Sequence, residues 1–319
     1  MAHEPPGLSS GAWAAATTLL VDHSTATVLA AFRADGVQAL LLKGPTIARW
    51  LYRDGEPRPY LDSDLLVRPA DATRARRVLA GIDYSPQLDE RRMPDWWRPH
   101  ASTWIRGDRG ATVDLHHRLQ GVGVDAGHAW ALLSEETETL DVAGTRAAAL
   151  SVPARTLYVA LTAANDGPSG MAMSDLERAL EHVSEDTWRT AAALAVELGA
   201  TDGLFAGLAQ RSDGIALAAR LGIRGRRSVE MGLRSVGAPR EALTVDQLAR
   251  ANSPRERMGI VADKLFPPPT YLRYWSPLAG RGRLGLGLAY GYRLVWVAKK
   301  TVPALTAWRR ARRTMTPPS

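Results

Sequence analysis

The sequence predicts an α+β fold, in which a small mixed β-sheet core has flanking helices and a larger helical region follows toward the C-terminus. Two observations predict this arrangement. Short apolar runs of strand length are confined to residues 36–120, whereas helical patterns precede residue 36 and dominate after residue 127. The chain has 319 residues, of which 45% are hydrophobic. That content suits about two ordinary globular domains and excludes disorder as the main state.

Residues 1–35 are predicted to form an N-terminal helix. Residues 12–21 are apolar, but no Lys or Arg precedes them, so they lack the basic region of a signal peptide. The helical pattern continues to about Ala34, and Gly36 is placed to end it.

Residues 36–125 are predicted to hold the sheet. The apolar run 37–42 is long enough for a buried strand and too short for a helix, and Pro45 can open a short helix just after it. Two glycines, Gly107 and Gly110, mark a turn between two strand-like segments, which indicates a hairpin. The expected strands are 37–42, 60–67, 83–85, 102–106 and 111–115, and the expected helices are 46–52 and 69–79.

Residues 126–265 are predicted to be a helical domain, because the pattern is helical for most of this stretch. Pro153 suits the first turn of a helix that ends near residue 164. Capping boxes, in which a Ser or Thr precedes an acid or amide by three residues, predict helix starts at Ser174 and Thr244. Another helix is expected to begin at Ser184.

The charge distribution separates the last segment, residues 266–319. Lys and Arg total 40 against 33 Asp and Glu, which gives a net charge of +7, but ten basic residues and no acid lie within residues 271–319. The rest of the chain holds 30 basic and 33 acidic residues, a net of −3. We interpret the segment as an amphipathic helix packed by Tyr290, Leu294 and Trp296. A peripheral contact with anionic lipid and an electrostatic arm for RNA or another anionic acceptor are the alternatives.

The apolar runs of this basic segment are shorter than the roughly 20 residues of a transmembrane helix, so no membrane span is predicted. The chain has no cysteine, which excludes disulfide scaffolds, thiolate zinc sites and cysteine nucleophiles. This composition fits a reducing compartment, and we expect a cytoplasmic protein.

Three acids are the candidate catalytic and metal-binding residues. Asp62 and Asp64 are two residues apart on a predicted strand, so their side chains point to the same face, with backbones about 6.6 Å apart. Asp114 lies on a later strand, and His116 shares its face. If the strands are neighbours, three carboxylates meet, and Mg²⁺ or Mn²⁺ would offset their mutual repulsion. We expect His116 to support Asp114 rather than to act directly.

A candidate phosphate-binding turn follows the run 37–42. Gly44 allows close backbone approach, Lys43 supplies a positive charge, and the start of the next helix offers backbone N–H groups. The GxxxxGK[ST] pattern of a P-loop is absent. The turn therefore predicts that Lys43 and Gly44 bind the phosphates of a nucleotide.

The chain resembles the uncharacterised bacterial nucleotidyltransferase family of the DNA-polymerase-β-like superfamily, through the runs LLKGPTIARWLY, GEPRPYLDSDLLV, ATRARRVLAG and TVDLHHRL. The resemblance covers about residues 40–223. It implies that Asp62 and Asp64 are the metal-binding pair, with Asp114 as the third acid. It also implies that Lys43-Gly44 is the phosphate loop, and that Arg58 faces the nucleotide phosphates or the acceptor.

The activity implied by this resemblance is a Mg²⁺- or Mn²⁺-dependent transfer of a nucleoside monophosphate from an NTP to an acceptor hydroxyl or phosphate, with release of pyrophosphate. A small molecule or a peptide is the expected acceptor, and nucleic acid is less favoured. Two departures from the family pattern, Pro45 after Gly44 and the polar Ser63 between the acids, motivate a second hypothesis. The chain would then be a non-catalytic adaptor that binds a nucleotide or a partner. An RNA-modifying nucleotidyltransferase is the third hypothesis.

Several other features carry less weight. His100 is near the candidate site in sequence only. Trp96, Trp97 and Trp104 are expected to be core or cleft-wall residues rather than a platform for stacking a nucleobase. Residues 280–285 match GxGxxG, but they follow no predicted strand, so we expect no dinucleotide site there.

Overall fold

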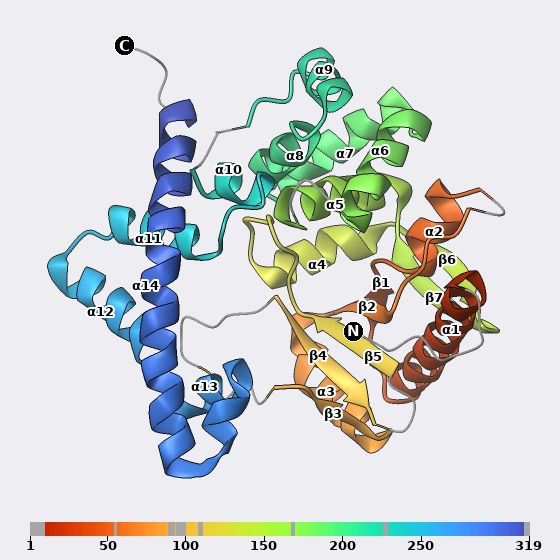
Figure 1. Ribbon diagram of the computed structural model, residues 1–319. Coiled ribbons are helices and arrows are strands. Elements are labelled where there is room, and N and C mark those ends of the chain that lie inside the picture. Colours follow the sequence, from red (N-terminus) through yellow and green to blue (C-terminus); the bar gives the residue numbers. More distant parts are fainter. Residues whose placement is uncertain are drawn as a thin grey trace. The chain divides into compact units, whose positions relative to one another are not determined.

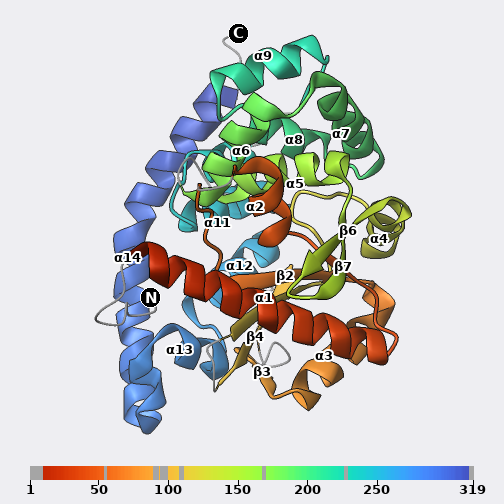
Figure 2. The same ribbon diagram turned by 90° about the vertical axis from the view of Figure 1, so that its right-hand side faces the viewer.

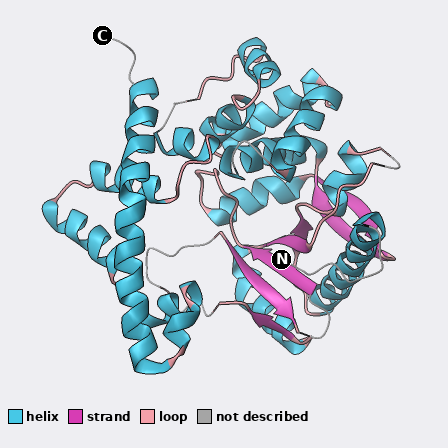
Figure 3. Cartoon of the chain, in the orientation of Figure 1, coloured by secondary structure: helices cyan, strands magenta, loops and turns pink. Residues whose placement is uncertain are grey.

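A computed structural model describes residues 10–53, 56–88, 93, 100–107, 111–166, 170–225 and 229–315. The chain forms two compact units. One comprises residues 1–87, 100–163 and 169–225 and contains all the strands described (Figure 3). The other comprises residues 88–99, 164–168 and 226–319, and the elements described in it are helical. The predicted α+β class is therefore confirmed.

The first unit is built on a seven-stranded mixed sheet in the order β3-β4-β5-β2-β1-β7-β6. Strand β2 pairs in parallel with β5, and β1 pairs in parallel with β7, whereas the other neighbouring strands are antiparallel. The strands are β1 (Ala39–Leu41), β2 (Asp62–Val67), β3 (Tyr84–Pro86), β4 (Ala101–Arg106), β5 (Ala111–His116), β6 (Thr137–Val142) and β7 (Thr145–Leu150). Each strand predicted within residues 36–125 is present, with ends shifted by one or two residues.

Helices cover both faces of this sheet. The helices of the unit are α1 (Ser10–Ala34), α2 (Pro45–Leu51), the 3₁₀ helix η1 (Pro69–Asp71), α3 (Ala72–Gly81), α4 (Ala126–Glu135), α5 (Val152–Asp166), α6 (Met171–His182), α7 (Glu185–Glu197), α8 (Thr201–Leu208) and α9 (Ser212–Arg220). Figure 2 shows α1 lying across one face of the sheet. The predicted N-terminal helix and its end near Gly36, which has a φ of 68°, are confirmed.

The alternation of side chains along the strands produces two hydrophobic cores. Leu65 and Val67 of β2 point toward α1 and α3, where they pack with Phe32 and Leu79. Leu66 points the other way, into a larger core formed with α2, α4 and α5–α8. Because strand residues alternate, Asp62 and Asp64 lie on the face of Leu66 and Ser63 lies on the face of α1.

The expectation that residues 126–265 are helical is wrong for residues 137–150, which form the β6–β7 hairpin and extend the sheet beside β1. Its turn uses Ala143 and Gly144 at φ values of 47° and 81°. Tight hairpin turns of this kind favour Asn-Gly or Asp-Gly, because both central residues have positive φ. An Ala-Gly turn gives no such sequence signal, which explains why the hairpin escaped prediction.

Both apparent capping boxes lie inside helices. Helix α6 begins at Met171, three residues before Ser174, and α11 (Glu241–Arg250) begins three residues before Thr244. An aspartate within each of these segments makes a tertiary contact, since Asp175 binds an arginine and Asp246 accepts a hydrogen bond from a tryptophan. The predicted cap at Ser184 is confirmed.

The second unit is organised around one long helix, α14, drawn in blue in Figure 1. Its elements are α10 (Val229–Ser235), α11, α12 (Pro254–Leu265), α13 (Pro269–Trp275), the 3₁₀ helix η3 (Pro277–Gly280) and α14 (Gly282–Met315). Small buried residues of α14, Ala289 and Ala304, allow close packing against its neighbours. Among the helices in the described ranges, none combines the length and the apolar character needed to cross a membrane.

Candidate metal and nucleotide site

The predicted carboxylates lie on two neighbouring strands of the first unit. Strands β2 and β5 pair in parallel, with Asp64 opposite Asp114 and Asp62 opposite Thr112. Residues opposite one another in adjacent strands share a face, so Asp64, Asp114 and His116 lie on the same side of the sheet as Asp62. The expectation that Asp114 reaches the strand of the acid pair is therefore confirmed.

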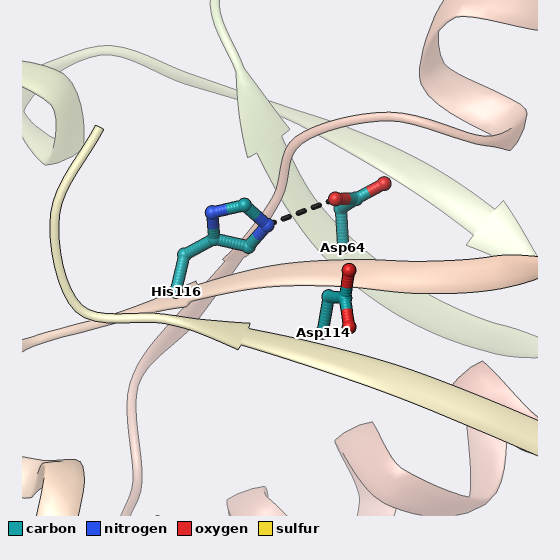
Figure 4. A group of neighbouring side chains, drawn as sticks. All are labelled: Asp64, Asp114 and His116. Atoms are coloured by element: carbon teal, nitrogen blue, oxygen red, sulfur yellow. Dashed lines mark hydrogen bonds and ion pairs between the residues drawn. The ribbon is translucent and has the colours of Figure 1, made fainter. Parts of the chain in front are cut away.

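Three side chains of this face form a cluster of ligand atoms. Atoms of Asp64, Asp114 and His116 lie within 4.8 Å of one another (Figure 4). His116 is buried, and its Nε2 lies 2.8 Å from Oδ1 of Asp64. The hydroxyl of Thr103 on β4 donates to Oδ1 of Asp114 at 2.7 Å. Two carboxylates and an imidazole at this spacing are donors that suit a divalent cation, so the residues fit the metal that the resemblance implies.

His116 supports a different acid from the one expected. The sequence suggested Asp114, which shares its strand, but the imidazole binds Asp64 on the neighbouring strand. Nδ1 of His116 is buried without a hydrogen-bond partner, and the ring of His100 lies 5.2 Å away, centroid to centroid. A single imidazole therefore holds the buried Asp64 in place through one nitrogen.

The surroundings of Asp62 and Asp64 shift the pKa values of these two acids in opposite directions. Burial and the charges of Asp64 and Asp114 raise the pKa of Asp62 to about 6. Burial by itself would also raise the pKa of Asp64, but the hydrogen bond from His116 and the charge of Lys43 together hold that pKa below its ordinary value. Asp64 is thus kept ionised, whereas Asp62, which is not one of the three side chains of the cluster, loses part of its tendency to ionise.

The Lys43-Gly44 turn lies beside these acids. Nζ of Lys43 is 3.9 Å from Oδ1 of Asp64 and 5.7 Å from the centroid of the Tyr158 ring. Gly44 has a φ of 68°, and a Cβ at this position would lie 3.3 Å from the ring of Tyr60. Only glycine adopts this conformation against that ring without strain. Pro45 then occupies the first turn of α2, as expected.

Ser63 is explained by the face opposite the acids. Its side chain is buried, and its hydroxyl forms a short hydrogen bond with Thr25 of α1. Thr25 in turn donates to the carbonyl oxygen of Val21 at 2.7 Å. The polar residue between the two acids therefore anchors the N-terminal helix and leaves the acid face unchanged.

Arg58 is engaged by helix α6. Its Nε and Nη2 donate to the two carboxylate oxygens of Asp175 at 2.7 and 2.6 Å, and both side chains are buried. The Tyr52 hydroxyl also donates to Asp175, at 2.8 Å. Arg58 is still near enough to Asp64 for its charge to help lower the pKa of that acid. A direct contact of Arg58 with phosphates or acceptor stays a prediction.

A surface depression of about 510 Å³ adjoins this network at Tyr52. Tyr52 belongs to its wall, and the guanidinium of Arg178 stacks 4.3 Å from the centre of the Tyr52 ring. Arg178 also pairs with Glu56 at 2.7 Å. The depression is lined by Tyr52, Arg53, Glu56, Pro57, Met171, Ser174, Glu177, Arg178, Glu181 and His182. Its wall therefore carries side chains of both charges.

Sequence reasoning missed Thr103, and it was wrong to place His100 near the site in sequence only, because the ring of His100 lies 5.2 Å from that of His116. Thr103 and His100 come to it because β4 pairs antiparallel with β5, with Thr103 opposite Asp114 and Ala101 opposite His116. The antiparallel pairing of β4 with β5 fixes this register. The two glycines at positions 107 and 110 of the sequence, which predict a hairpin, are the signal that would have found Thr103. Asp175, by contrast, is 117 residues from Arg58, and no local pattern links the two.

The remaining candidates do not contribute to the cluster. Trp104 is buried in the core beneath α1 and α3, and Trp96 and Trp97 lie outside the described residues. Residues 280–285 span the end of η3 and the start of α14, and the element directly before η3 is the helix α13. The GxGxxG match there therefore lacks the preceding strand that a dinucleotide site requires.

A mixed sheet that presents carboxylates from two parallel neighbouring strands beside a Lys-Gly turn defines a protein of the nucleotidyltransferase class, as the resemblance implied. The chain belongs to the uncharacterised nucleotidyltransferase family, whose family model matches residues 9–211. No curated protein matches the chain. Among solved structures, it is similar to an antigenic nucleotidyltransferase-like protein from Paracoccidioides brasiliensis, with 12% identity and a TM-score of 0.32 over 68% of this chain and 95% of that chain.

Proposed function

We propose that the chain transfers a nucleoside monophosphate from an NTP to a hydroxyl or phosphate of a small-molecule or peptide acceptor, with Mg²⁺ or Mn²⁺ as cofactor. The observation that carries this proposal is the meeting of Asp64 and Asp114 on adjacent parallel strands, with Lys43 3.9 Å from Asp64. Membership of the nucleotidyltransferase family supports the same reaction class.

In the proposed reaction, an acceptor oxygen forms a bond to the α-phosphorus of the NTP while the bond from that phosphorus to the β-phosphate oxygen breaks. Asp62, Asp64 and Asp114 would hold the divalent metal ions, which when bound lower the pKa of the acceptor hydroxyl and stabilise the leaving pyrophosphate. Asp114 accepts the hydroxyl proton. Lys43 and the Gly44 backbone bind the phosphates, and Thr103 fixes the carboxylate of Asp114.

His116 would act as a positioning residue in this scheme. Its hydrogen bond lowers the pKa of Asp64, so the carboxylate stays ionised and ready to bind a cation at neutral pH. Alternatively, an imidazole that gives up this hydrogen bond would be close enough to offer Nε2, unprotonated, as a ligand. Because nitrogen donors suit transition metals better than Mg²⁺, this arrangement favours Mn²⁺ over Mg²⁺.

The depression beside Arg58 is the surface that we propose for the acceptor. Its wall combines Arg53, Arg178 and His182 with Glu56 and Glu177, which matches a molecule that carries both charges, such as a peptide. Arg58 would couple this surface to the acid cluster, since it binds Asp175 on one side and lowers the pKa of Asp64 on the other.

The direct test is metal-dependent release of pyrophosphate from each NTP, measured with peptide, small-molecule and RNA acceptors. We expect activity with Mn²⁺ or Mg²⁺ that is lost in the Asp62→Ala, Asp64→Ala double variant. Unchanged activity in that variant would refute the assignment. Calorimetric titration of Mn²⁺ and of each NTP separates this proposal from a non-catalytic adaptor, for which we expect no metal-linked nucleotide binding.

The alternative of a non-catalytic adaptor was motivated by Pro45 and Ser63, and both residues have a structural role. Ser63 pairs with Thr25 on the far face of β2, and Pro45 serves as the first residue of α2. Neither departure removes a donor atom from the acid cluster. An RNA-modifying enzyme would be indicated if the RNA acceptor is the one that releases pyrophosphate in the same assay.

A further inference from the structure

Helix α14 exposes an apolar stripe along one side. Leu284 is 87% exposed, Leu288 67% and Val302 70%, and Tyr292 and Val295 are also exposed. At 3.6 residues per turn, successive residues are about 100° apart, so these five positions fall within an arc of roughly 80°. They therefore form one continuous line along the helix, which we call the α14 stripe.

The opposite side of the helix is already occupied. Ala289, Arg293, Ala304 and Ala311 are buried, and α14 packs there against α10–α13 and η3 of the same unit. Their helical angles centre about 140° away from the stripe. The stripe is thus not the packing face of α14, and the described residues of this unit leave it exposed.

Basic residues flank and continue the stripe. Lys299 lies within the same arc, and Arg309, Arg310 and Arg313 follow on that side in the last turns. No acid occurs after Asp263. The local charge is therefore uniformly positive, and a partner of negative charge is the one that complements it.

One basic residue of the segment has a different role. Arg293 is buried, where its Nε donates to the carbonyl oxygen of Lys264 at 2.8 Å. Its guanidinium lies 5.2 Å from the ring centre of Tyr271 and 5.1 Å from that of Trp275. The other nine basic residues of the segment are exposed.

The expected anchors of this helix are only partly correct. Tyr290 packs in the core of the unit and its hydroxyl donates to the carbonyl oxygen of Pro267 at 2.6 Å. Trp296 contacts the Trp275 ring at a centroid distance of 5.5 Å. Leu294, however, is 38% exposed and does not belong to the buried face.

We propose that the α14 stripe binds the surface of a membrane that contains anionic lipids. A helix that presents an aliphatic face edged by Lys and Arg lies in the plane of the bilayer interface, with its apolar side chains at the boundary between headgroups and acyl chains. Leu284, Leu288, Val295 and Val302 supply that face, while Lys299 and the arginines after residue 308 contact the headgroups.

A nucleic acid fits these side chains less well. Phosphates would complement the basic residues, but the ring of Tyr292 already lies 5.7 Å from that of Trp275, centroid to centroid. The aliphatic residues of the stripe would nevertheless stay exposed to water on an RNA strand. Its phosphates interact with charged side chains and its bases stack on rings, and neither buries an aliphatic side chain. A lipid surface covers both the apolar and the basic parts of the helix.

The test measures cosedimentation of the full chain with vesicles of phosphatidylcholine alone and of phosphatidylcholine mixed with phosphatidylserine. We expect binding to the mixed vesicles, weakening as salt increases, and little binding to the neutral ones. The Leu284→Ser, Leu288→Ser variant should bind the mixed vesicles at least about tenfold more weakly, because each Leu loses the transfer of its apolar surface.

The matched control is the Val196→Ser, Met258→Ser variant, which removes two apolar side chains of similar exposure from α7 and α12. We expect it to bind vesicles as the unchanged chain does. Circular dichroism and Mn²⁺ binding establish that both variants fold. Amide exchange should show protection of residues 284–302 when mixed vesicles are added.

Three outcomes would overturn the proposal. The first is absence of binding to mixed vesicles, and the second is an equal loss of binding in the control variant. The third is occupation of the stripe by something else. That would be shown by RNA binding without vesicle binding, or by a dimer in light scattering that the Leu284→Ser, Leu288→Ser variant abolishes.

Discussion

Replacing Asp62 with Asn removes one charge from the carboxylate cluster and keeps the shape of the side chain. Burial and the neighbouring acids raise the pKa of Asp62 from 3.8 to about 6 in the folded protein. Its protonated form therefore stabilises the fold below about pH 4, and this stabilisation is lost as the pH rises through 6. Above pH 6 the ionised Asp62 lowers stability relative to Asn.

The size of the effect follows from the pKa. A difference of about two pH units corresponds to at most about 3 kcal/mol, and solvent screening of this partly exposed carboxylate reduces it to about 2 kcal/mol. For a unit of about 200 residues, that raises the melting temperature of the Asp62→Asn variant by roughly 4–8 °C near pH 8. The two proteins should melt together near pH 4.

The assay is thermal unfolding in a chelator, repeated with Mn²⁺. A metal that binds only the folded chain adds about 2.7 kcal/mol at one hundred times its dissociation constant. We expect Mn²⁺ to stabilise the unchanged protein strongly and Asp62→Asn weakly, so that their order reverses. An exposed acid, as in Glu197→Gln, serves as the control. The reasoning is refuted if Asp62→Asn lowers the melting temperature without metal, or if Mn²⁺ stabilises both proteins equally.

Three further substitutions test other contacts by urea unfolding. Gly44→Ala should lower the free energy of unfolding by about 1–3 kcal/mol and weaken NTP binding, because its φ is positive; an unchanged midpoint contradicts this. Arg58→Ala should cost about 3–5 kcal/mol by leaving Asp175 buried and unpaired, and Asp175→Asn in the same chain should recover part of the loss. Ser63→Ala should cost about 1 kcal/mol by removing one of the two hydrogen bonds of the buried Thr25 hydroxyl, while Mn²⁺ affinity stays unchanged.

The acid cluster was largely predictable because each part of it depends on a local pattern. Alternation along a strand places Asp62 and Asp64 on one face, and the predicted hairpin places Asp114 on a separate strand. Family resemblance then indicates that these strands are neighbours. His116 forms its hydrogen bond with Asp64 and not with the expected Asp114. This choice depends on how β2 and β5 lie beside each other, which the periodicity of a single strand does not determine.

The hairpin β6–β7 and the Arg58–Asp175 pair were not predictable for a different reason. An Ala-Gly turn lacks the residues that identify tight hairpins, and β7 becomes part of the sheet only by pairing with β1, more than one hundred residues earlier. Likewise, an arginine near an acid pair has several acids within reach along the chain. Which one it binds is decided by the docking of α6 on the sheet.

The sequence by itself determined the fold class, the positions of the strands along the chain up to residue 116, the carboxylates of the candidate site and the confinement of positive charge to the last segment. These depend on side-chain periodicity and composition, which act over a few residues. Tertiary structure decided which partner each buried charge binds, why Ser63 is tolerated between the acids, and which side of α14 remains exposed. Such choices depend on packing between distant segments, because a buried polar group must be satisfied by whatever the fold brings to it.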